Sequence, residues 1–139
     1  EELFLTRFST IKESELTNGI CHGDLQSENF HITPENKFTF FDFDFFGTGY
    51  LIYDIGVFMW YDHKNKPPEI MRSFLKGYES KRPLTPTEHQ LIPWFSTLRA
   101  IFQMTLYCTI SDGKQLPLWP AQQVADFIHK VEKWHSRLC

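Results

Sequence analysis

The feature of the sequence that most constrains its fold is a β-hairpin signal in the first third of the chain. Residues 30–33 (Phe-His-Ile-Thr) and residues 38–43 (Phe-Thr-Phe-Phe-Asp-Phe) are two short runs rich in strand-forming side chains. The Pro-Glu-Asn-Lys segment at 34–37 between them has the composition of a tight turn. A hairpin brings its two open ends together, so the residue before the first strand and the end of the second strand are expected to be neighbours.

On both sides of this hairpin the sequence predicts mainly helix. Part of residues 3–17 has a helical pattern that stops at 17–19 (Thr-Asn-Gly), and 47–49 (Gly-Thr-Gly) breaks the pattern after the hairpin. Further helices are expected at 54–61, from 67 to near 77, from 85 to about 110 with a kink or break at Pro93, and after Pro120. The phenylalanines between 38 and 46 are expected to lie in the core. The prediction is an α+β, mostly helical fold, with a single domain over residues 1–139.

Three polar side chains are predicted to converge at the open end of the hairpin. Asp24 and Asn29 lie in the loop before the first strand, and Asp42 ends the second strand. Carboxylate and carboxamide oxygens suit a hard cation, above all Mg²⁺, which takes one or two carboxylates together with substrate phosphates. A second carboxylate that the metal does not need can orient and deprotonate a hydroxyl. This is the equipment of phosphoryl transfer, in which positioning and charge neutralisation dominate.

The spacing of these residues resembles a known family. The pattern His22-Gly23-Asp24 with Asn29 five residues later, then Asp42 at a strand end and Asp54 before Ile-Gly, is similar to the aminoglycoside phosphotransferase family. Choline, ethanolamine and type II homoserine kinases are its relatives, and the layout is similar to the H-R-D-L-x-x-x-N and D-F-G motifs of protein kinases. The resemblance covers about residues 20–60. It implies the C-terminal lobe of a protein-kinase-like fold, in which a small hairpin carries the catalytic and metal loops.

The resemblance also implies a role for each matched residue. Asp24 corresponds to the catalytic base that accepts the proton of the attacking hydroxyl of a small molecule. Asn29 and Asp42 correspond to the Mg²⁺ ligands that hold ATP. His22 corresponds to a histidine that braces the loop, and Asp54 to an aspartate that holds the loop through backbone N–H groups.

Two further positions near the site are less constrained by the pattern. His31 lies two residues after Asn29, where a kinase-like layout places a side chain beneath the adenine of ATP. Asp44 is expected to share a strand face with Asp42, so it could support the metal, but a role as a solvated or turn-capping residue explains Asp44 at least as well. Gln26 departs from the family, which commonly has histidine there. Glutamine can form hydrogen bonds but cannot take up a proton at neutral pH.

The largest departure from the family is an absence before the catalytic loop. Only 21 residues precede His22, too few for the N-terminal lobe with the glycine-rich loop and the lysine that cover ATP. We therefore expect the chain to be a fragment that is inactive alone. The surface that should meet the missing lobe, including Phe30, Phe38 and Phe45, is expected to be exposed and to promote self-association.

Three other functions compete with a kinase as explanations of the sequence. A non-catalytic, kinase-relic binding module is the alternative that shares the same motif, and a metal-dependent hydrolase is weaker because one set of metal ligands is visible. A purely structural helical domain leaves the spacing of the motif unexplained. The sequence leaves the acceptor open among aminoglycosides, choline, homoserine and protein hydroxyls.

The overall composition excludes several classes of function. The net charge of −3 is too small to indicate nucleic acid or an anionic membrane as a partner, and no apolar run is long enough to span a bilayer. The three cysteines are far apart and odd in number, which argues against a disulfide framework or a zinc site. A signal peptide is not expected from the first residues. A cytoplasmic protein with reduced thiols is the expectation.

Overall fold

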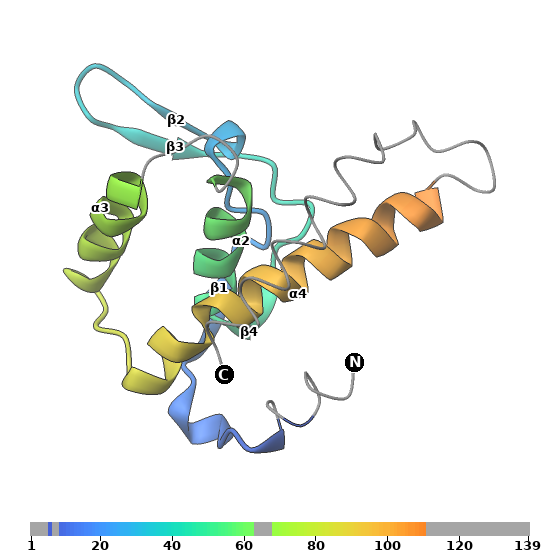
Figure 1. Cartoon of the computed structure of the whole chain (residues 1–139). Helices are drawn as coiled ribbons and strands as arrows, with labels where there is room; N and C mark the ends of the chain where they lie inside the picture. Colours follow the sequence, from blue (N-terminus) through green and yellow to red (C-terminus); the bar gives the residue numbers. More distant parts are fainter. Residues whose placement is uncertain (1–5, 7–8, 63–67, 111–139) are drawn as a thin grey trace. The chain divides into compact units, whose positions relative to one another are not determined.

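The structure of the protein is a computed structural model that describes residues 6, 9–62 and 68–110. Contacts divide the chain into two units, Glu1–Ser96 and Thr97–Cys139, and the elements described below that position the site belong to the first. The order of elements along the chain is η1 (Glu13–Glu15), β1 (Asn18–Cys21), η2 (Ser27–Asn29), β2 (Phe30–Ile32), β3 (Phe38–Phe40), β4 (Gly47–Tyr50), α2 (Ile52–Asp62), α3 (Pro68–Glu79) and α4 (Pro86–Ile110) (Figure 1).

The predicted hairpin is present, although its second strand is shorter than expected. Strands β2 and β3 pair antiparallel with Phe30 opposite Phe40 and Ile32 opposite Phe38. In the turn, Asn36 has a φ of 59°, a left-handed conformation that asparagine tolerates better than most residues. Strand β3 ends at Phe40 rather than at residue 43, because Asp42 has a φ of 64° and leaves the extended conformation.

The glycine-rich segment after the hairpin was wrongly predicted as a break. Residues Gly47–Tyr50 form strand β4, which pairs antiparallel with β1. The expected helix stop at Asn18-Gly19 is likewise wrong, since these residues begin β1 and lie opposite Tyr50 and Gly49. The strand partner lies about thirty residues away, and its backbone hydrogen bonds override a local propensity that disfavours glycine in strands.

The three long helices follow the predicted pattern. Helix α2 begins two residues before Asp54, and α3 begins at Pro68. The break expected at Pro93 is wrong, because α4 continues through this residue as one helix. Of the helix expected within residues 3–17, Glu13–Glu15 form a single 3₁₀ turn, and Thr6 and Ser9 are helical. The helix expected after Pro120 lies outside the described residues.

The core of the first unit lies between these helices. Ile55, Leu84 and Ile92 are buried together, and the aromatic rings of Phe58 and Phe74 stack with centroids 3.9 Å apart. Helices α2 and α4 approach closely at Gly56, where a Cβ would lie 2.7 Å from the Cβ of Phe95. Only glycine permits this separation.

The phenylalanines around the hairpin do not form the core that the sequence predicted. Their exposed fractions range from 39% to 58%, at Phe38, Phe40, Phe41, Phe43, Phe45 and Phe46. Among the described residues the hairpin sheet has two strands, and no described element covers these rings. Exposed aromatic surface of this extent is typical of a contact site.

The first turn of α4 is fixed by a reciprocal cap. The backbone N–H of Glu88 donates to Thr85 Oγ1 at 3.0 Å, and the backbone N–H of Thr85 donates to Glu88 Oε2 at 2.9 Å. This is a capping box, and Pro86 occupies the first helical position, where its missing N–H costs nothing. The start of α4 is therefore specified locally by four residues.

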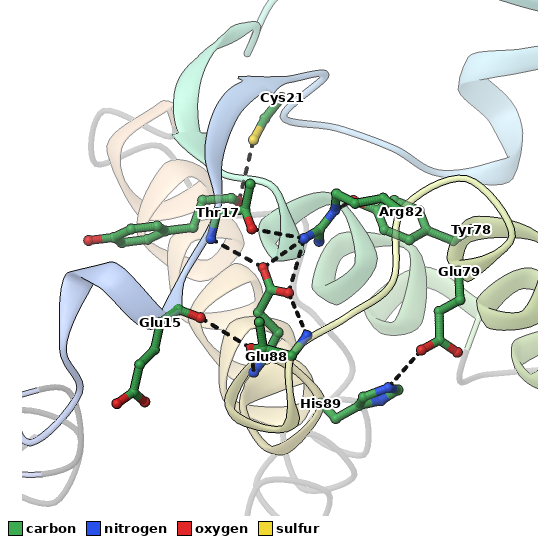
Figure 2. A network of polar contacts seen from close by, with 10 residues as sticks. Glu15, Thr17, Cys21, Tyr78, Glu79, Arg82, Glu88 and His89 are labelled. Atoms are coloured by element: carbon green, nitrogen blue, oxygen red, sulfur yellow. Dashed lines mark hydrogen bonds and ion pairs between the residues drawn. The ribbon is translucent and has the colours of Figure 1, made fainter.

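The same Glu88 carboxylate also joins α4 to the start of the first sheet. It is fully buried, pairs with Arg82 Nη1 at 2.9 Å, and accepts a hydrogen bond from the backbone N–H of Thr17 at 3.2 Å (Figure 2). Thr17 immediately precedes β1, the strand that leads into the catalytic loop. Burial acts to raise the pKa of Glu88, but the hydrogen bonds from Thr85, Arg82 and Thr17 hold that pKa below its usual value.

Within residues 6, 9–62 and 68–110, no helix combines the length and the apolar character needed to cross a membrane.

Candidate active site

The loop between β1 and η2 is shaped by a glycine with a special conformation. Gly23 has a φ of 82°, in a region of backbone conformation that residues other than glycine rarely adopt. A Cβ at this position would overlap the backbone carbonyl of Phe45. Both the backbone angle and the close approach therefore require glycine immediately before Asp24.

The carboxylate of Asp54, in the first turn of α2, accepts hydrogen bonds from this loop. Asp54 Oδ2 accepts the backbone N–H of His22, and Asp54 Oδ1 accepts the backbone N–H of Gly23, both at 2.8 Å. Burial raises the pKa of Asp54 and the nearby Asp24 carboxylate adds to this rise, while the two backbone hydrogen bonds and His22 oppose it. Because two consecutive backbone N–H groups donate to the same carboxylate, the orientation of the backbone immediately before Asp24 is fixed.

The imidazole of His22 connects the loop to the segment that follows β3. Its Nδ1 accepts the backbone N–H of Asp24 at 3.4 Å, so Nε2 carries the proton and donates to the Phe41 carbonyl at 3.0 Å. The ring also lies 4.6 Å from the ring of Phe43, measured between centroids. His22 thus braces Asp24 and the backbone next to Asp42 through one side chain.

Asp24 is buried, and two carboxamides hold its carboxylate. Asn29 Nδ2 donates to both Asp24 Oδ2 and the Asp24 backbone oxygen, each at 2.9 Å. Gln26 Nε2 donates to the same Oδ2 at 3.1 Å. The glutamine that departs from the family pattern is therefore a second amide donor to Asp24, a contact that its position two residues after Asp24 could have indicated.

Asp42 lies at the mouth of the hairpin but is not part of a strand. The backbone N–H of Phe41 donates to the Asn29 carbonyl at 3.1 Å, which continues the pairing of β2 and β3 by one step and brings Asp42 next to it. Asp42 is exposed and adopts a positive φ, as given above. The expectation that Asp42 and Asp44 share a strand face is wrong, because alternation of side chains requires extended backbone at both positions.

The donor set available to a metal is small. Among the residues that the structure describes, no three histidine, cysteine, aspartate or glutamate side chains gather in one place. The amide hydrogens of Asn29 are directed to Asp24, which leaves its Oδ1 as the atom that can bind a cation. One carboxamide oxygen and the Asp42 carboxylate suit a cation that takes its other ligands from phosphates and water.

His31 lies apart from these residues, in the middle of β2. It is exposed and pairs with Thr39 across the hairpin. Its neighbours Phe30 and Ile32 have side chains on the opposite face of the hairpin, because successive side chains in a strand alternate. That opposite face lines an apolar cavity of about 640 Å³ together with residues of α2 and α3.

The structure thus places a buried aspartate on a loop that a second aspartate anchors, beside a short hairpin, as the resemblance to phosphotransferases implies. The family model described as the phosphotransferase enzyme family matches residues 2–94. The chain belongs to this family. The predicted resemblance to aminoglycoside phosphotransferases is confirmed.

Three curated proteins are similar in sequence to this chain. An amicoumacin kinase of Bacillus subtilis is 32% identical over 88% of this chain and 39% of its own length. An uncharacterized protein of Deinococcus radiodurans is 36% identical over 66% of this chain and 28% of its own length, and one of Synechocystis is 40% identical over 50% and 19%. The chain thus spans less than half the length of each of these relatives.

A solved structure has the same fold. An amicoumacin kinase in complex with AMP-PNP, Ca²⁺ and Ami superposes with a TM-score of 0.68 at 24% sequence identity, over 98% of this chain and 42% of that chain. The predicted α+β, kinase-like fold is confirmed at this level.

Proposed function

We propose that this chain is the catalytic part of an ATP- and Mg²⁺-dependent phosphotransferase that transfers the γ-phosphate of ATP to a hydroxyl of a small molecule. The observation that carries the proposal is the buried Asp24 carboxylate, held by the side-chain amides of Asn29 and Gln26. Membership of the phosphotransferase family supports it.

In this proposal Asp24 accepts the proton of the acceptor hydroxyl. The two amide donors fix the direction of Oδ2, and the Asp54 carboxylate fixes the backbone from which Asp24 projects. A base that is held in one position lowers the activation barrier of transfer, chiefly because it does not have to be oriented anew in each turnover. His22 and Asp54 act as positioning residues and do not touch the substrate.

Asn29 and Asp42 would hold Mg²⁺ together with the nucleotide. Asn29 Oδ1 and the exposed Asp42 carboxylate are oxygen donors of the kind that this ion prefers. When bound, the metal neutralises charge on the β- and γ-phosphates. The nucleotide analogue and Ca²⁺ in the solved amicoumacin kinase support a nucleotide and a divalent cation here. His31 is proposed to lie near the base of the nucleotide.

The part of the enzyme that covers ATP is proposed to lie outside this chain. The chain spans 39% of the amicoumacin kinase of Bacillus subtilis and 42% of the solved amicoumacin kinase chain. The exposed rings of Phe38 and Phe45 offer an apolar surface for the remaining part. Without that part the phosphates are held from one side, so the isolated chain should not catalyse transfer.

The proposal is tested by a screen for acceptor-dependent ATP consumption with the full-length protein and Mg²⁺. The panel contains amicoumacin, an aminoglycoside, choline and homoserine. Amicoumacin is included because a relative is named for it, and the other three represent acceptor classes of the family. Consumption that rises with one acceptor, and that is lost on chelation of the metal, supports a kinase. Binding of nucleotide without consumption for any acceptor would favour the kinase-relic module instead.

A further inference from the structure

A second cavity of the first unit lies directly beside the catalytic loop. It has a volume of about 210 Å³, and Gly23 is among the residues that line it. Asp24, the proposed base, is not itself a lining residue but directly follows Gly23 in the chain. The larger cavity described above lies instead under the hairpin, against α2 and α3.

Two glycines of β4 keep this second cavity open. Gly47 and Gly49 are two residues apart, so they face the same side of the strand, and both line the cavity. Neither has a positive φ. A Cβ at Gly47 would meet no atom within 4 Å, and one at Gly49 would meet only Cys21 Sγ, at 3.7 Å. Neither backbone conformation nor packing therefore requires glycine at these positions.

Glycine in a strand is unfavourable unless something approaches the backbone closely. It weakens the strand because it has no side chain to pack and loses the most conformational freedom on folding. Cys21, which lies opposite Gly47 on β1, adds only a small side chain to the same face. Leu51 covers this face of the sheet at Gly19, but beside Gly47 and Gly49 the face is backbone, and the space that larger side chains would fill there is the cavity.

The other walls of the cavity are aromatic. Tyr50, Tyr53 and Phe95 line it, and the ring of Phe95 meets Tyr50 and Tyr53 edge-on, with centroids 6.3 and 6.4 Å apart. None of the described lining residues carries a charge. The volume exceeds the roughly 150 Å³ of an apolar cavity that holds benzene and is below the roughly 300 Å³ of the smallest drug-sized sites. The cavity therefore suits one ring.

We infer that this cavity binds an uncharged, flat ring of the acceptor and so places the acceptor hydroxyl at Asp24. The inference rests on the proposed function and names its substrate class as ring-bearing alcohols. A polycationic acceptor fits poorly, because its ammonium groups would lose hydration without gaining a counter-charge. Flat rings, by contrast, gain contact with the aromatic walls and with the exposed backbone of β4.

The test is a binding measurement that does not depend on catalysis. Benzyl alcohol, which combines a neutral ring with a hydroxyl, is titrated into the full-length protein without nucleotide and followed by ligand-observed NMR, with kanamycin as the cationic competitor. We expect saturable binding that kanamycin does not displace. Gly47→Val should weaken this binding at least tenfold without lowering Tm, because valine suits a strand and meets no atom there.

Two further variants keep the outcome decisive. Gly49→Ala fills less of the cavity and should cause a smaller loss of binding. This variant replaces Gly47→Val in the test if Gly47→Val proves unstable. Gly77→Ala is the matched control, since it lies on α3, outside the cavity, and its Cβ would also meet nothing within 4 Å. Wild-type binding in both cavity variants, or no saturable binding in the wild type, overturns the inference.

Transfer assays separate this inference from the proposed function. If the enzyme phosphorylates a ring-bearing acceptor, Gly47→Val should raise the KM for that acceptor about tenfold with kcat nearly unchanged. An unchanged KM would discard the ring site and leave the kinase intact. Ring binding that is lost in Gly47→Val, in a protein that transfers phosphate to no acceptor, would discard the kinase and leave the ring site.

Discussion

The side-chain amide of Asn29 donates to the carboxylate of Asp24 at 2.9 Å. One contact thus links the residue proposed to bind the metal to the residue proposed to take the proton. The same nitrogen also donates to the backbone oxygen of Asp24, so two contacts with Asp24 hold the amide group of Asn29. The spacing of five residues between them allows this contact within one loop.

Replacing Asp24 should abolish transfer and leave the fold intact. Asp24→Asn keeps the shape of the side chain and its hydrogen-bonding capacity but removes the base. We expect kcat of the full-length enzyme to fall by about 10²–10⁴-fold with little change in Tm. The control is Glu28→Gln, the same chemical change at an exposed position of the same loop. Wild-type turnover in Asp24→Asn at saturating substrate would remove Asp24 from this role.

The two carboxylates after β3 should differ in their effect on nucleotide binding. Asp42→Ala should weaken binding of Mg²⁺ with AMP-PNP at least tenfold, because Asp42 adjoins the residue that pairs with Asn29. Asp44→Ala is the control, since Asp44 is equally exposed and two residues away. Isothermal titration calorimetry of both variants decides between them. Equal losses would show that neither is a specific ligand.

Glu88 should stabilise the fold in a pH-dependent way. Its pKa in the folded state is lowered, so its contribution is complete above the unfolded value of about 4.3 and is lost as the pH falls through the folded pKa. At pH 7, Glu88→Gln should cost about 3 kcal/mol of unfolding free energy, because Arg82 loses its buried partner. Urea unfolding at several pH values should show this difference shrinking below about pH 4.

The control for Glu88 is a glutamate in an exposed pair. Glu69 bonds Arg72 at 2.7 Å, and its side chain is 64% exposed. Glu69→Gln should change the unfolding free energy by less than about 0.5 kcal/mol at every pH. A cost for Glu88→Gln that stays constant from pH 7 to pH 3.5 would contradict the ionic role of the buried glutamate.

Two helical glycines should respond to alanine with opposite signs. Gly56→Ala should destabilise the protein by about 1–3 kcal/mol, since its Cβ would lie 2.7 Å from Phe95 Cβ and 2.8 Å from the backbone nitrogen of Ser96. Gly77→Ala meets nothing within 4 Å and should stabilise α3 by up to about 1 kcal/mol. Thermal unfolding of both variants measures the two signs. A stabilised Gly56→Ala would show that α2 and α4 can separate without cost.

The isolated 139-residue chain should be inactive and should self-associate. Its exposed Phe38 and Phe45 are 58% and 39% accessible and should seek a partner when the rest of the enzyme is absent. Light scattering is expected to show a dimer or larger species, and Phe38→Ser with Phe45→Ser should shift it toward monomer. A monomeric isolated chain with kinase turnover would refute the fragment hypothesis.

The sequence predicted the elements that depend on local patterns. The turn at 34–37, the helices α2, α3 and α4 and the family follow from turn residues, apolar periodicity and the spacing of His22, Asp24 and Asn29. These signals act over a few residues, or are carried by residue types at set separations, so they can be read along the chain. The start of α4 is the clearest case, because its capping box consists of Thr85 and Glu88 alone.

Other features were decided only by contacts between distant segments. Strand β4 exists because β1 pairs with it, and the phenylalanines near the hairpin are exposed because no described element covers them. The left-handed conformation of Asp42 ended β3 early, and the two bonds from Asp54 reach back across about thirty residues to His22 and Gly23. Residue type states which bonds a side chain can form, but the tertiary structure decides which partners come within reach, since hydrogen bonding and burial depend on distances in space.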